Sequence, residues 1–304
     1  MKILKSILLI CISCFVSKVD AQRYQNDKKL KETETITKEL SFSQISPDNI
    51  LVVENVYGSI DVEGYSGNTI KIEVIKTISA DTNEELQKGK EEIGIKSAKK
   101  DDAIYVYLDS PYSHFDLSTG QFEHREFSYN YRKNYKHRTK RMYKYRLDFK
   151  IKIPKNTSID LQAVNRGNIT VKDVHGKLLI VNNINGAIDM ENVSGTTDVN
   201  ALNKDINISY SENPKEESFY NSLNGDITIK FQEDLDASIT YKTLNGDFYT
   251  NFDLSKNSPQ FKSTKEYSNN KTKYKVNATK QFKIGNGKVH LSFNQLNGDA
   301  ILKK

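Results

Sequence analysis

The chain has 304 residues, a length that allows about two ordinary domains or one long repeat architecture. Hydrophobic residues make up 37% of it and charged residues 28%, with a mean hydropathy of −0.65, which excludes an intrinsically disordered chain and a multi-span membrane protein. Two cysteines exclude a disulfide-rich scaffold, and a net charge of +6 is too small to indicate a nucleic-acid-binding polycation.

The first 21 residues have the pattern of a secretory signal peptide. Lys2 and Lys5 precede an uncharged run at 6–16, and the segment closes on the small residue Ala21. The run is shorter than the roughly 20 apolar residues of a membrane-spanning helix. We therefore expect cleavage near Ala21 and an extracytoplasmic location: the periplasm, the outer-membrane surface or the medium.

Both cysteines, Cys11 and Cys14, lie in this leader, so the mature chain is expected to contain none. A C-x-x-C pair can be redox-active, but no βαβ pattern surrounds this one. Lipid attachment at Cys14 is an alternative, disfavoured because Cys11 stands where a leucine is usual. The leader contains three lysines and one aspartate, so its removal changes the net charge from +6 to +4.

The rest of the chain is expected to be a flexible N-terminus at residues 22–36, followed by one β-strand-repeat domain at residues 37–304. One short helix is predicted in the lead-in, over 82–90, because Thr82 and Glu85 have the spacing of a capping box. The predicted parts of the domain are a lead-in at 37–109, a basic aromatic excursion at 110–146, regular repeats at 147–254, an excursion at 255–281 and closing repeats at 282–304.

A short phrase, Gly-x-Ile-x-Val and its variants, returns throughout the domain. Its starts step by 9 or 10 residues between 167 and 204, and then by 21 residues to 225 and to 246. Apolar and polar residues alternate after each start, which is the pattern of a half-buried strand. Two such strands make one full turn of about 20 residues. The clearest copies begin at Gly58, Gly167, Gly186, Lys204, Gly225 and Gly246.

Asn-Gly pairs precede five of the strands and mark sharp turns. Asn and Gly are the residues that best tolerate a positive φ, so we expect a positive φ at Gly225 and destabilisation by Gly225→Val. Asn-Gly is also the strongest hairpin signal, which leaves an antiparallel meander as the alternative. The regularity of the copies favours an all-β fold of the β-solenoid or β-helix-like kind.

Several phrases of the chain resemble the "putative adhesin" family of exported β-strand-repeat proteins, a family of unknown function. The resemblance runs from about residue 35 to the C-terminus, and it implies an exported β-helical protein without a catalytic motif. The phrases that carry it are Tyr57-Gly-Ser-Ile-Asp-Val-Glu-Gly, Ile153-Pro-Lys-Asn-Thr-Ser-Ile-Asp-Leu, Leu223-Asn-Gly-Asp-Ile-Thr-Ile, Ile284-Gly-Asn-Gly-Lys-Val and Leu296-Asn-Gly-Asp-Ala-Ile-Leu.

The excursion at 110–146 departs from the resemblance and is unusually basic and aromatic. Eleven of the 30 aromatic residues lie between Tyr105 and Tyr145. Cations interleaved with tyrosines can bind anionic polymers, although a hairpin that only covers the sheet is the competing interpretation. The candidate ligand-contact residues are Tyr129, Tyr131, Arg132, Lys133, Tyr135, Lys136, Arg138, Lys140 and Arg141.

Two further groups of residues carry side chains suited to chemistry. The histidines at 114, 124 and 137 have spacings of 10 and 13 residues, which match no metal-ligand pattern. Asp226, Asp247 and Asp299 follow Asn-Gly turns and could form a row that hydrolyses sugars or holds calcium, but an Asp there is ordinary turn chemistry. No metal, cofactor or small-molecule substrate is predicted.

The sequence therefore predicts an exported, non-enzymatic cell-envelope protein, an adhesin-like binding or structural module. Its expected partners are an envelope polysaccharide, another polyanion or another envelope protein. The alternatives are a polysaccharide-processing enzyme on a β-helix and an envelope-stress structural component without a ligand.

Overall fold

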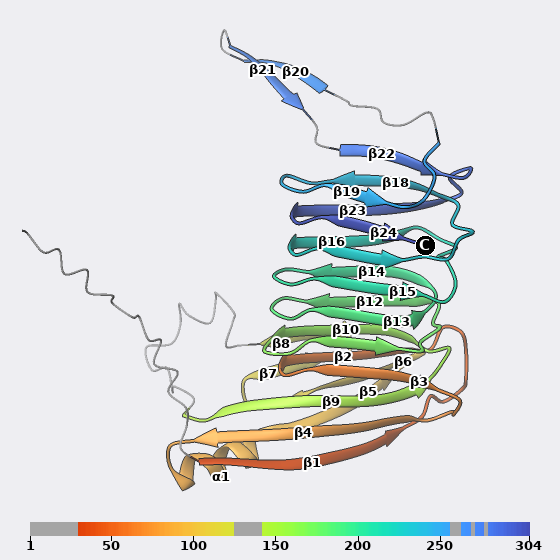
Figure 1. Ribbon diagram of the computed structural model, residues 1–304. Helices are drawn as coiled ribbons and strands as arrows, with labels where there is room; N and C mark the ends of the chain where they lie inside the picture. Colours follow the sequence, from red (N-terminus) through yellow and green to blue (C-terminus); the bar gives the residue numbers. More distant parts are fainter. Residues whose placement is uncertain (1–29, 125–141, 256–262, 269–270, 277–278) are drawn as a thin grey trace, which may run out of the picture.

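A computed structural model describes residues 30–124, 142–255, 263–268, 271–276 and 279–304. The described chain is almost entirely β-structure, arranged as two sheets that face each other in a tall stack (Figure 1). The predicted signal peptide lies outside the described residues. The single described helix, α1 (Asn83–Glu92), lies at the N-terminal end of the stack.

Sheets A and B each contain ten strands. In spatial order, sheet A consists of β1 (Leu30–Leu40), β4 (Ile70–Ala80), β9 (Lys144–Pro154), β3 (Ile60–Tyr65), β11 (Ile169–Lys172), β13 (Ile188–Val193), β15 (Ile206–Tyr210), β17 (Ile227–Lys230), β24 (Ala300–Lys303) and β19 (Phe248–Thr250). Sheet B consists of β22 (Thr279–Ile284), β18 (Ala237–Lys242), β23 (Val289–Asn297), β16 (Ser218–Asn224), β14 (Thr196–Ala201), β12 (Leu178–Asn183), β10 (Ser158–Asn165), β2 (Ile50–Tyr57), β6 (Ala103–Asp109) and β5 (Gly94–Lys100). Two separate hairpins are β7 (Ser113–Asp116) with β8 (Gln121–His124), and β20 (Ser263–Ser268) with β21 (Lys271–Val276).

The repeat unit is a rung, which we define as a strand of sheet B, a sharp corner and the following strand of sheet A. Neighbouring rungs pair in parallel and in register: Ile169 lies opposite Ile188, Ile188 opposite Ile206, and Ile206 opposite Ile227. The prediction of parallel solenoid-like stacking is thus confirmed for these rungs, and the meander is excluded there. The sheets are not uniform, because β1, β4, β5 and β22 pair antiparallel at the two ends.

The order of the rungs departs from the order of the sequence at the C-terminal end. The 21-residue step from Gly225 to Gly246 predicts adjacent rungs, but the rung β23–β24 lies between them. β23 pairs with β16 on one side and β18 on the other, and β24 pairs with β17 and β19. The rung β23–β24 therefore does not close the stack, and β22 of sheet B and β19 of sheet A form its last strands.

The N-terminal boundary also differs from the prediction. Residues 30–36 are not a flexible segment: they form the first part of β1, which pairs antiparallel with β4 along its whole length. Thr and Ile alternate with charged residues there, which suits an exposed edge strand. The predicted helix is confirmed: the Oγ1 atom of Thr82 accepts a hydrogen bond from the backbone N–H of Glu85 at 3.2 Å.

The core lies between the two sheets and is built from inward side chains that stack on their equivalents. The column Ile169, Ile188, Ile206 and Ile227 is fully buried. Aromatic residues fill the C-terminal half: the rings of Tyr220 and Phe293, on neighbouring strands, stack with centroids 4.8 Å apart. No covalent link contributes in the described chain, so burial of these columns supplies most of the stability.

The glycine at the corner has a role other than the predicted one. Gly225 is not among the glycines with positive φ, so that prediction is wrong. A Cβ atom at Gly225 would instead lie 2.4 Å from the carbonyl oxygen of Lys204 on the preceding rung. Position 225 needs glycine because its rung approaches the backbone of Lys204 too closely for a side chain.

Candidate functional site

The nine candidate ligand-contact residues, Tyr129, Tyr131, Arg132, Lys133, Tyr135, Lys136, Arg138, Lys140 and Arg141, all lie outside the described residues. Their predicted role therefore stays a prediction. After this segment the described chain resumes at Met142, two residues before β9 begins. β9 is the third strand of sheet A, between β4 and β3.

Part of the aromatic excess has a structural role. The hairpin β7–β8 lies on the outer face of β6, where four rings pack together. The centroids of Tyr107 and Phe115 are 4.4 Å apart, and those of Phe115 and Phe122 are 4.8 Å apart. Tyr105 contacts the same two phenylalanines. For these four residues the interpretation as sheet cover is the correct one.

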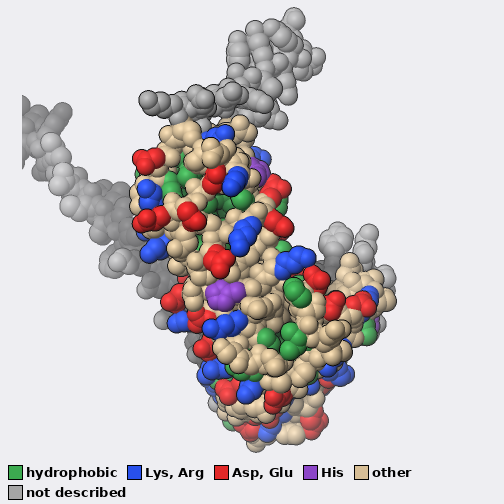
Figure 2. Space-filling view, turned by 90° about the vertical axis from the view of Figure 1, so that its right-hand side faces the viewer, with side chains coloured by type: hydrophobic (Ala, Val, Ile, Leu, Met, Phe, Trp, Pro, Cys, Tyr) green, Lys and Arg blue, Asp and Glu red, His purple; other side chains and the backbone are tan. Residues whose placement is uncertain are grey.

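The edge of the stack opposite the Asn-Gly corners carries mixed charge. Acidic and basic side chains are interspersed over this face (Figure 2). Lys177 pairs with Asp48 at 3.0 Å, and Lys215 pairs with Glu212 at 3.3 Å. A small hollow of about 270 Å³ contains His175, whose Nδ1 atom lies 3.1 Å from the hydroxyl of Ser194. Such alternating charge suits a solvated surface better than a site for one sign of ligand.

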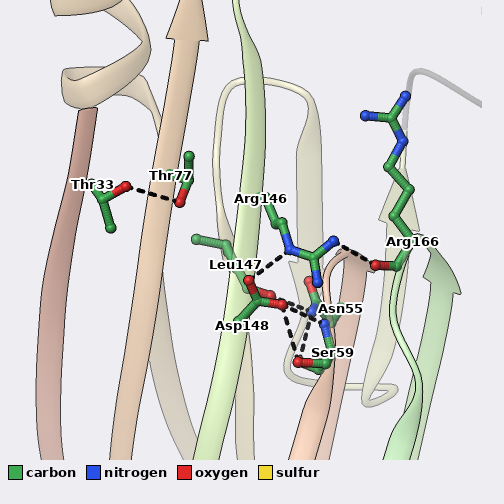
Figure 3. A network of polar contacts seen from close by, with 8 residues as sticks. All are labelled: Thr33, Asn55, Ser59, Thr77, Arg146, Leu147, Asp148 and Arg166. Atoms are coloured by element: carbon green, nitrogen blue, oxygen red, sulfur yellow. Dashed lines mark hydrogen bonds and ion pairs between the residues drawn. The ribbon is translucent and has the colours of Figure 1, made fainter. Parts of the chain in front are cut away.

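A polar network joins β9 to the first regular rung (Figure 3). The Oδ1 atom of Asp148 accepts hydrogen bonds from the backbone N–H and the hydroxyl of Ser59, at 2.9 and 3.0 Å. Its Oδ2 atom accepts from Nε of Arg146 at 2.6 Å, and Arg146 also donates to the carbonyl oxygen of Arg166. Burial alone would raise the pKa of Asp148, but these hydrogen bonds outweigh it and hold the pKa below its usual value. The network holds β9, the strand that follows the candidate ligand-contact residues in the chain, against the corner at Ser59.

The aspartates at the corners do form a row, but their carboxylates bind the backbone. Asp226 accepts from the N–H of Asp299 at 2.9 Å, and Asp299 accepts from the N–H of Asp247 at 2.8 Å. Asp205 holds Asp226 in the same way at 3.0 Å. This is the turn chemistry that the sequence favoured, repeated from rung to rung. The carboxylates of Asp205, Asp226 and Asp299 each accept a hydrogen bond from a backbone N–H of the next corner. Among the described residues no group of three metal-ligating side chains comes together.

A hydrogen-bond relay that sequence reasoning missed lies on the outer face of sheet B. Thr240 Oγ1 is 2.9 Å from Nε2 of His290, and Nδ1 of His290 is 2.5 Å from Oε1 of Glu217. The order of groups is that of a nucleophile, a base and an acid. However, β18, which carries Thr240, pairs with β22 and β23, so its backbone N–H groups are engaged in the sheet and do not form an oxyanion hole. We interpret the relay as a cross-strand contact.

Sheet A has a charged groove of about 800 Å³ on its outer face. Lysines and acidic residues together line it, with strands β4, β9, β3 and β11 beneath. The charges pair across strands: Lys152 with Glu63 at 3.3 Å and Lys150 with Glu73 at 3.8 Å. Because these lysines are neutralised by adjacent carboxylates, this groove does not favour a polyanion.

A second groove, of about 940 Å³, runs across the outer face of sheet B next to the Asn-Gly corners. These corners are the turns at the left of the stack in Figure 1. We call it the amide groove. It crosses β12, β14, β16, β23 and β18, and Lys242 is the one charged residue among those that line it. Its lining residues are Asn182, Asn183, Ile184, Asn200, Ala201, Leu202, Asn221, Ser222, Leu223, Lys242, Thr243, Leu244, Thr279, Asn294, Gln295 and Leu296.

The first column of the amide groove consists of asparagines at equivalent positions of successive strands. Nδ2 of Asn200 donates to Oδ1 of Asn182 at 2.8 Å, and Nδ2 of Asn221 donates to Oδ1 of Asn200 at 2.7 Å. Asn294 lies opposite Asn221, and Lys242 continues the column on β18. Each amide has two N–H donors and two acceptor lone pairs, so the hydrogen bonds between rungs use only part of its capacity.

The second column of the groove is aliphatic and lies two residues after the first in the chain, at or just past the end of each strand, beside the corner. Its members are Ile184, Leu202, Leu223, Leu296 and Leu244. Leu202 is 40% exposed and Leu244 69%, although leucine is among the residues most often buried. Four of these five belong to the ten large hydrophobic residues most exposed in the described chain. A repeated apolar column beside a repeated amide column is the signal that the aligned copies contained and that reasoning from single motifs missed.

Residues 146–292 match the model of the family described as Toastrack DUF4097, which confirms the resemblance over this segment. A "putative cell adhesion protein" from Clostridium sporogenes ATCC 15579 aligns at 14% identity over 90% of this chain and 99% of that chain, with a TM-score of 0.41. A "putative adhesin" from Bacteroides fragilis NCTC 9343 aligns at 10% identity over 88% of this chain and 97% of that chain, with a TM-score of 0.37. No curated protein matches the chain. No helix in the described ranges is long and apolar enough to cross a membrane.

Proposed function

We propose that the chain is an exported, non-enzymatic binding module of the cell envelope that holds an uncharged glycan chain along the amide groove. The observation that carries this proposal is the composition of the groove. Charged residues make up 28% of the chain, yet one lysine is the only charge among the sixteen residues that line it. A surface with so little charge favours a ligand without charge.

The chemistry of the two columns supports a carbohydrate. Hydroxyl groups both donate and accept hydrogen bonds, as the side-chain amides of Asn200 and Asn221 do. The exposed aliphatic side chains, such as Leu202, offer apolar contact to the C–H faces of sugar rings. The columns repeat at the spacing of neighbouring strands, about 4.8 Å, so a linear polymer can meet the same pair of groups at each rung.

A peptide is a poorer match for the amide groove. All five strands beneath it are paired on both sides within sheet B, so no free backbone edge is available for an added strand. A bound peptide would have to satisfy its backbone through side chains alone. We therefore assign the groove to a glycan rather than to another protein.

Binding assays with the mature chain test the proposal. The probes are neutral unbranched polysaccharides, a dextran, a β-glucan and a mannan, immobilised separately, with heparin as the polyanion. We expect binding to at least one neutral polymer that is insensitive to NaCl and is lost in Leu202→Glu with Leu244→Glu. The matched control is Thr170→Glu, an exposed position on the outer face of sheet A. If no neutral polymer binds, or if the groove variant binds as the unmodified chain does, the proposal fails.

The basic aromatic excursion at 110–146 is a second proposed contact, for an anionic polymer. Its support is compositional: ten basic residues between 121 and 150 against three acidic ones. Counterion release makes such binding weaken steeply with salt, which separates it from binding in the amide groove. Arg138→Glu, Lys140→Glu and Arg141→Glu together should abolish salt-dependent heparin binding and leave neutral-glycan binding unchanged. If the triple variant binds heparin as strongly as the unmodified chain does, this second contact is wrong.

Export is part of the proposal and has its own test. The leader at 1–21 supports it through its charge and hydrophobicity pattern. The mature protein should begin at Gln22 when its N-terminus is sequenced, and it should be digested by protease added to intact cells if it faces the medium. A mature chain that retains Met1 would contradict cleavage, and a chain that begins at Cys14 would indicate lipid attachment instead.

A further inference from the structure

The C-terminal rung β23–β24 fills a slot between two rungs that precede it in the sequence. On one side Leu291 lies opposite Ser218 and Ala300 lies opposite Ile227. On the other side Leu291 lies opposite Ile239, and Ala300 lies opposite Phe248. A rung that follows both of its neighbours in the sequence is therefore an interior rung of the stack.

The three rungs at this point have the same corner sequence. Each contains Leu-Asn-Gly-Asp, at 223–226, 296–299 and 244–247 in spatial order. Asn297 donates to Asn224 at 2.8 Å and accepts from Asn245 at 2.9 Å. The aspartates of the same rungs repeat this relation through their backbone N–H groups. The slot thus presents equivalent corner groups on both sides of the inserted rung.

The inserted rung is coupled to β22. β22 and β23 are joined by the turn 285–288 and pair with opposite edges of β18. Oδ1 of Asp236 accepts hydrogen bonds from the N–H groups of Gly287 and Lys288, which holds the turn. Residues 279–304 thus form one unit that encloses β18, and we call it the C-terminal unit.

We propose that the C-terminal unit is exchanged between two copies of this chain, so that each copy fills the slot of the other. The partner that fits the slot best is the same sequence, because its corner hydrogen bonds and its register are already matched on both sides. Exchange of an identical element is a low-cost route to a dimer, since every interaction formed between the two copies replaces an identical interaction within one copy.

Removal of the C-terminal unit uncovers two complementary surfaces. The slot between β16–β17 and β18–β19 is left without its inserted rung. The released unit exposes Leu291, Phe293 and Leu302, which are fully buried in the stack. The exposed apolar side chains favour capture of the unit by another copy when the protein is concentrated.

Single-cysteine chains test the exchange. All variants carry Cys11→Ser and Cys14→Ser. One chain carries Asn224→Cys, and a second chain, with a mass tag, carries Asn297→Cys; they are mixed at high concentration, held briefly in mild urea, returned to buffer and oxidised. The control replaces the first chain by one with Asn203→Cys, which lies one rung further from Asn297 along the same row of asparagines.

We expect a disulfide-linked heterodimer of the 224 and 297 chains, several-fold more abundant than with the 203 control and increasing with protein concentration. A single chain that carries both Asn224→Cys and Asn297→Cys shows whether the two positions can be oxidised at all. If this double variant forms its intramolecular disulfide while the mixed chains give no more heterodimer than the control, the C-terminal unit is not exchanged and the inference is wrong.

Discussion

The side-chain amide of Asn297 donates a hydrogen bond to the side-chain oxygen of Asn224 at 2.8 Å, although 73 residues separate them in the chain. The bond belongs to a row that joins Asn165, Asn185, Asn203, Asn224, Asn297 and Asn245 across six rungs. Because the amides within the row both donate and accept, the row fixes the register of every rung relative to the next.

Removal of one amide from the row should destabilise the stack moderately. Asn297→Ala loses two hydrogen bonds at an exposed corner, so we expect the free energy of unfolding to fall by about 1 kcal/mol. Urea unfolding followed by circular dichroism measures the change. Lys303→Ala, an exposed position on the same rung, is the control and should change the value little. Equal effects of the two substitutions would mean that the row adds no stability.

Gly225→Val should be strongly destabilising for a steric reason. Its Cβ atom would collide with the backbone of Lys204, and the rungs cannot separate without breaking their pairing. We expect a loss of roughly 3 kcal/mol or more, as for other backbone clashes in a packed site. Gly94→Ala is the control, because its Cβ atom would meet its nearest neighbour, in Asp109, at 3.8 Å, an ordinary contact. A fully stable Gly225→Val variant would contradict the close approach of the rungs.

Lys76 should anchor the N-terminal end of the stack. Its side chain is 4% exposed, and Nζ donates to the carbonyl oxygens of Lys90 and Ile93 at 2.8 and 2.6 Å while it pairs with Glu34 at 2.8 Å. Lys76→Met leaves carbonyl groups at the end of α1 without this donor, at an expected cost of about 2 kcal/mol.

The control for Lys76 is Lys88→Met, which removes an exposed ion pair with Glu92 and should cost under about 0.5 kcal/mol. Hydrogen exchange of the α1 amides, measured by mass spectrometry, localises the effect. The role assigned to Lys76 is wrong if Lys76→Met leaves both the stability and the exchange of α1 as they are.

Asp160 should make stability depend on pH in the opposite sense to Asp148. Burial, and then the charges of Glu54 and Asp198, raise the pKa of Asp160. A carboxyl group with a raised pKa in the folded state destabilises the fold once it ionises, and the penalty disappears below the unfolded pKa of about 3.9. Asp160→Asn should therefore increase stability at neutral pH and lose this advantage in acid.

Urea unfolding of the Asp160→Asn variant across the acid range measures this effect. The control is Asp148→Asn, for which the lowered pKa of Asp148 predicts the reverse: a stabilising contribution present at neutral pH and lost as the pH falls through the folded-state pKa. A stability difference between Asp160→Asn and the unmodified chain that stays constant with pH would contradict the assignment.

Much of the rung architecture could be predicted from local pattern. The alternation in Ile169 to Val171 and its copies identifies the buried face, because a strand places every second side chain on the same side. The helix start at Thr82 was predictable because it depends on a residue three positions away. The row of corner aspartates was predictable because the same turn residue recurs at equivalent positions of the rungs. The first strand was missed because only Leu30 and Ile36 are apolar in residues 30–36, and the polar residues between them are typical of a loose segment.

The order of the C-terminal rungs could not be predicted, and the physical cause is the repeat itself. The corners at Gly225, Gly246 and Gly298 offer the same contacts, so local sequence does not determine which rung lies next to which. The amide groove was missed for a related reason. Leu202 and Asn200 are ordinary residues singly, and they form a surface only when equivalent side chains on neighbouring strands line up.

The most direct test of the proposed function is an NMR titration of the side-chain amide signals of asparagine with a neutral oligosaccharide taken from the polymer that binds. The predicted result is that the signals of Asn200, Asn221 and Asn294 shift, while those of Asn207 on the outer face of sheet A do not. Leu202→Glu with Leu244→Glu should abolish these shifts. Saturable binding that leaves the three groove signals in place, and moves signals elsewhere, would contradict the assignment of the amide groove as the glycan site.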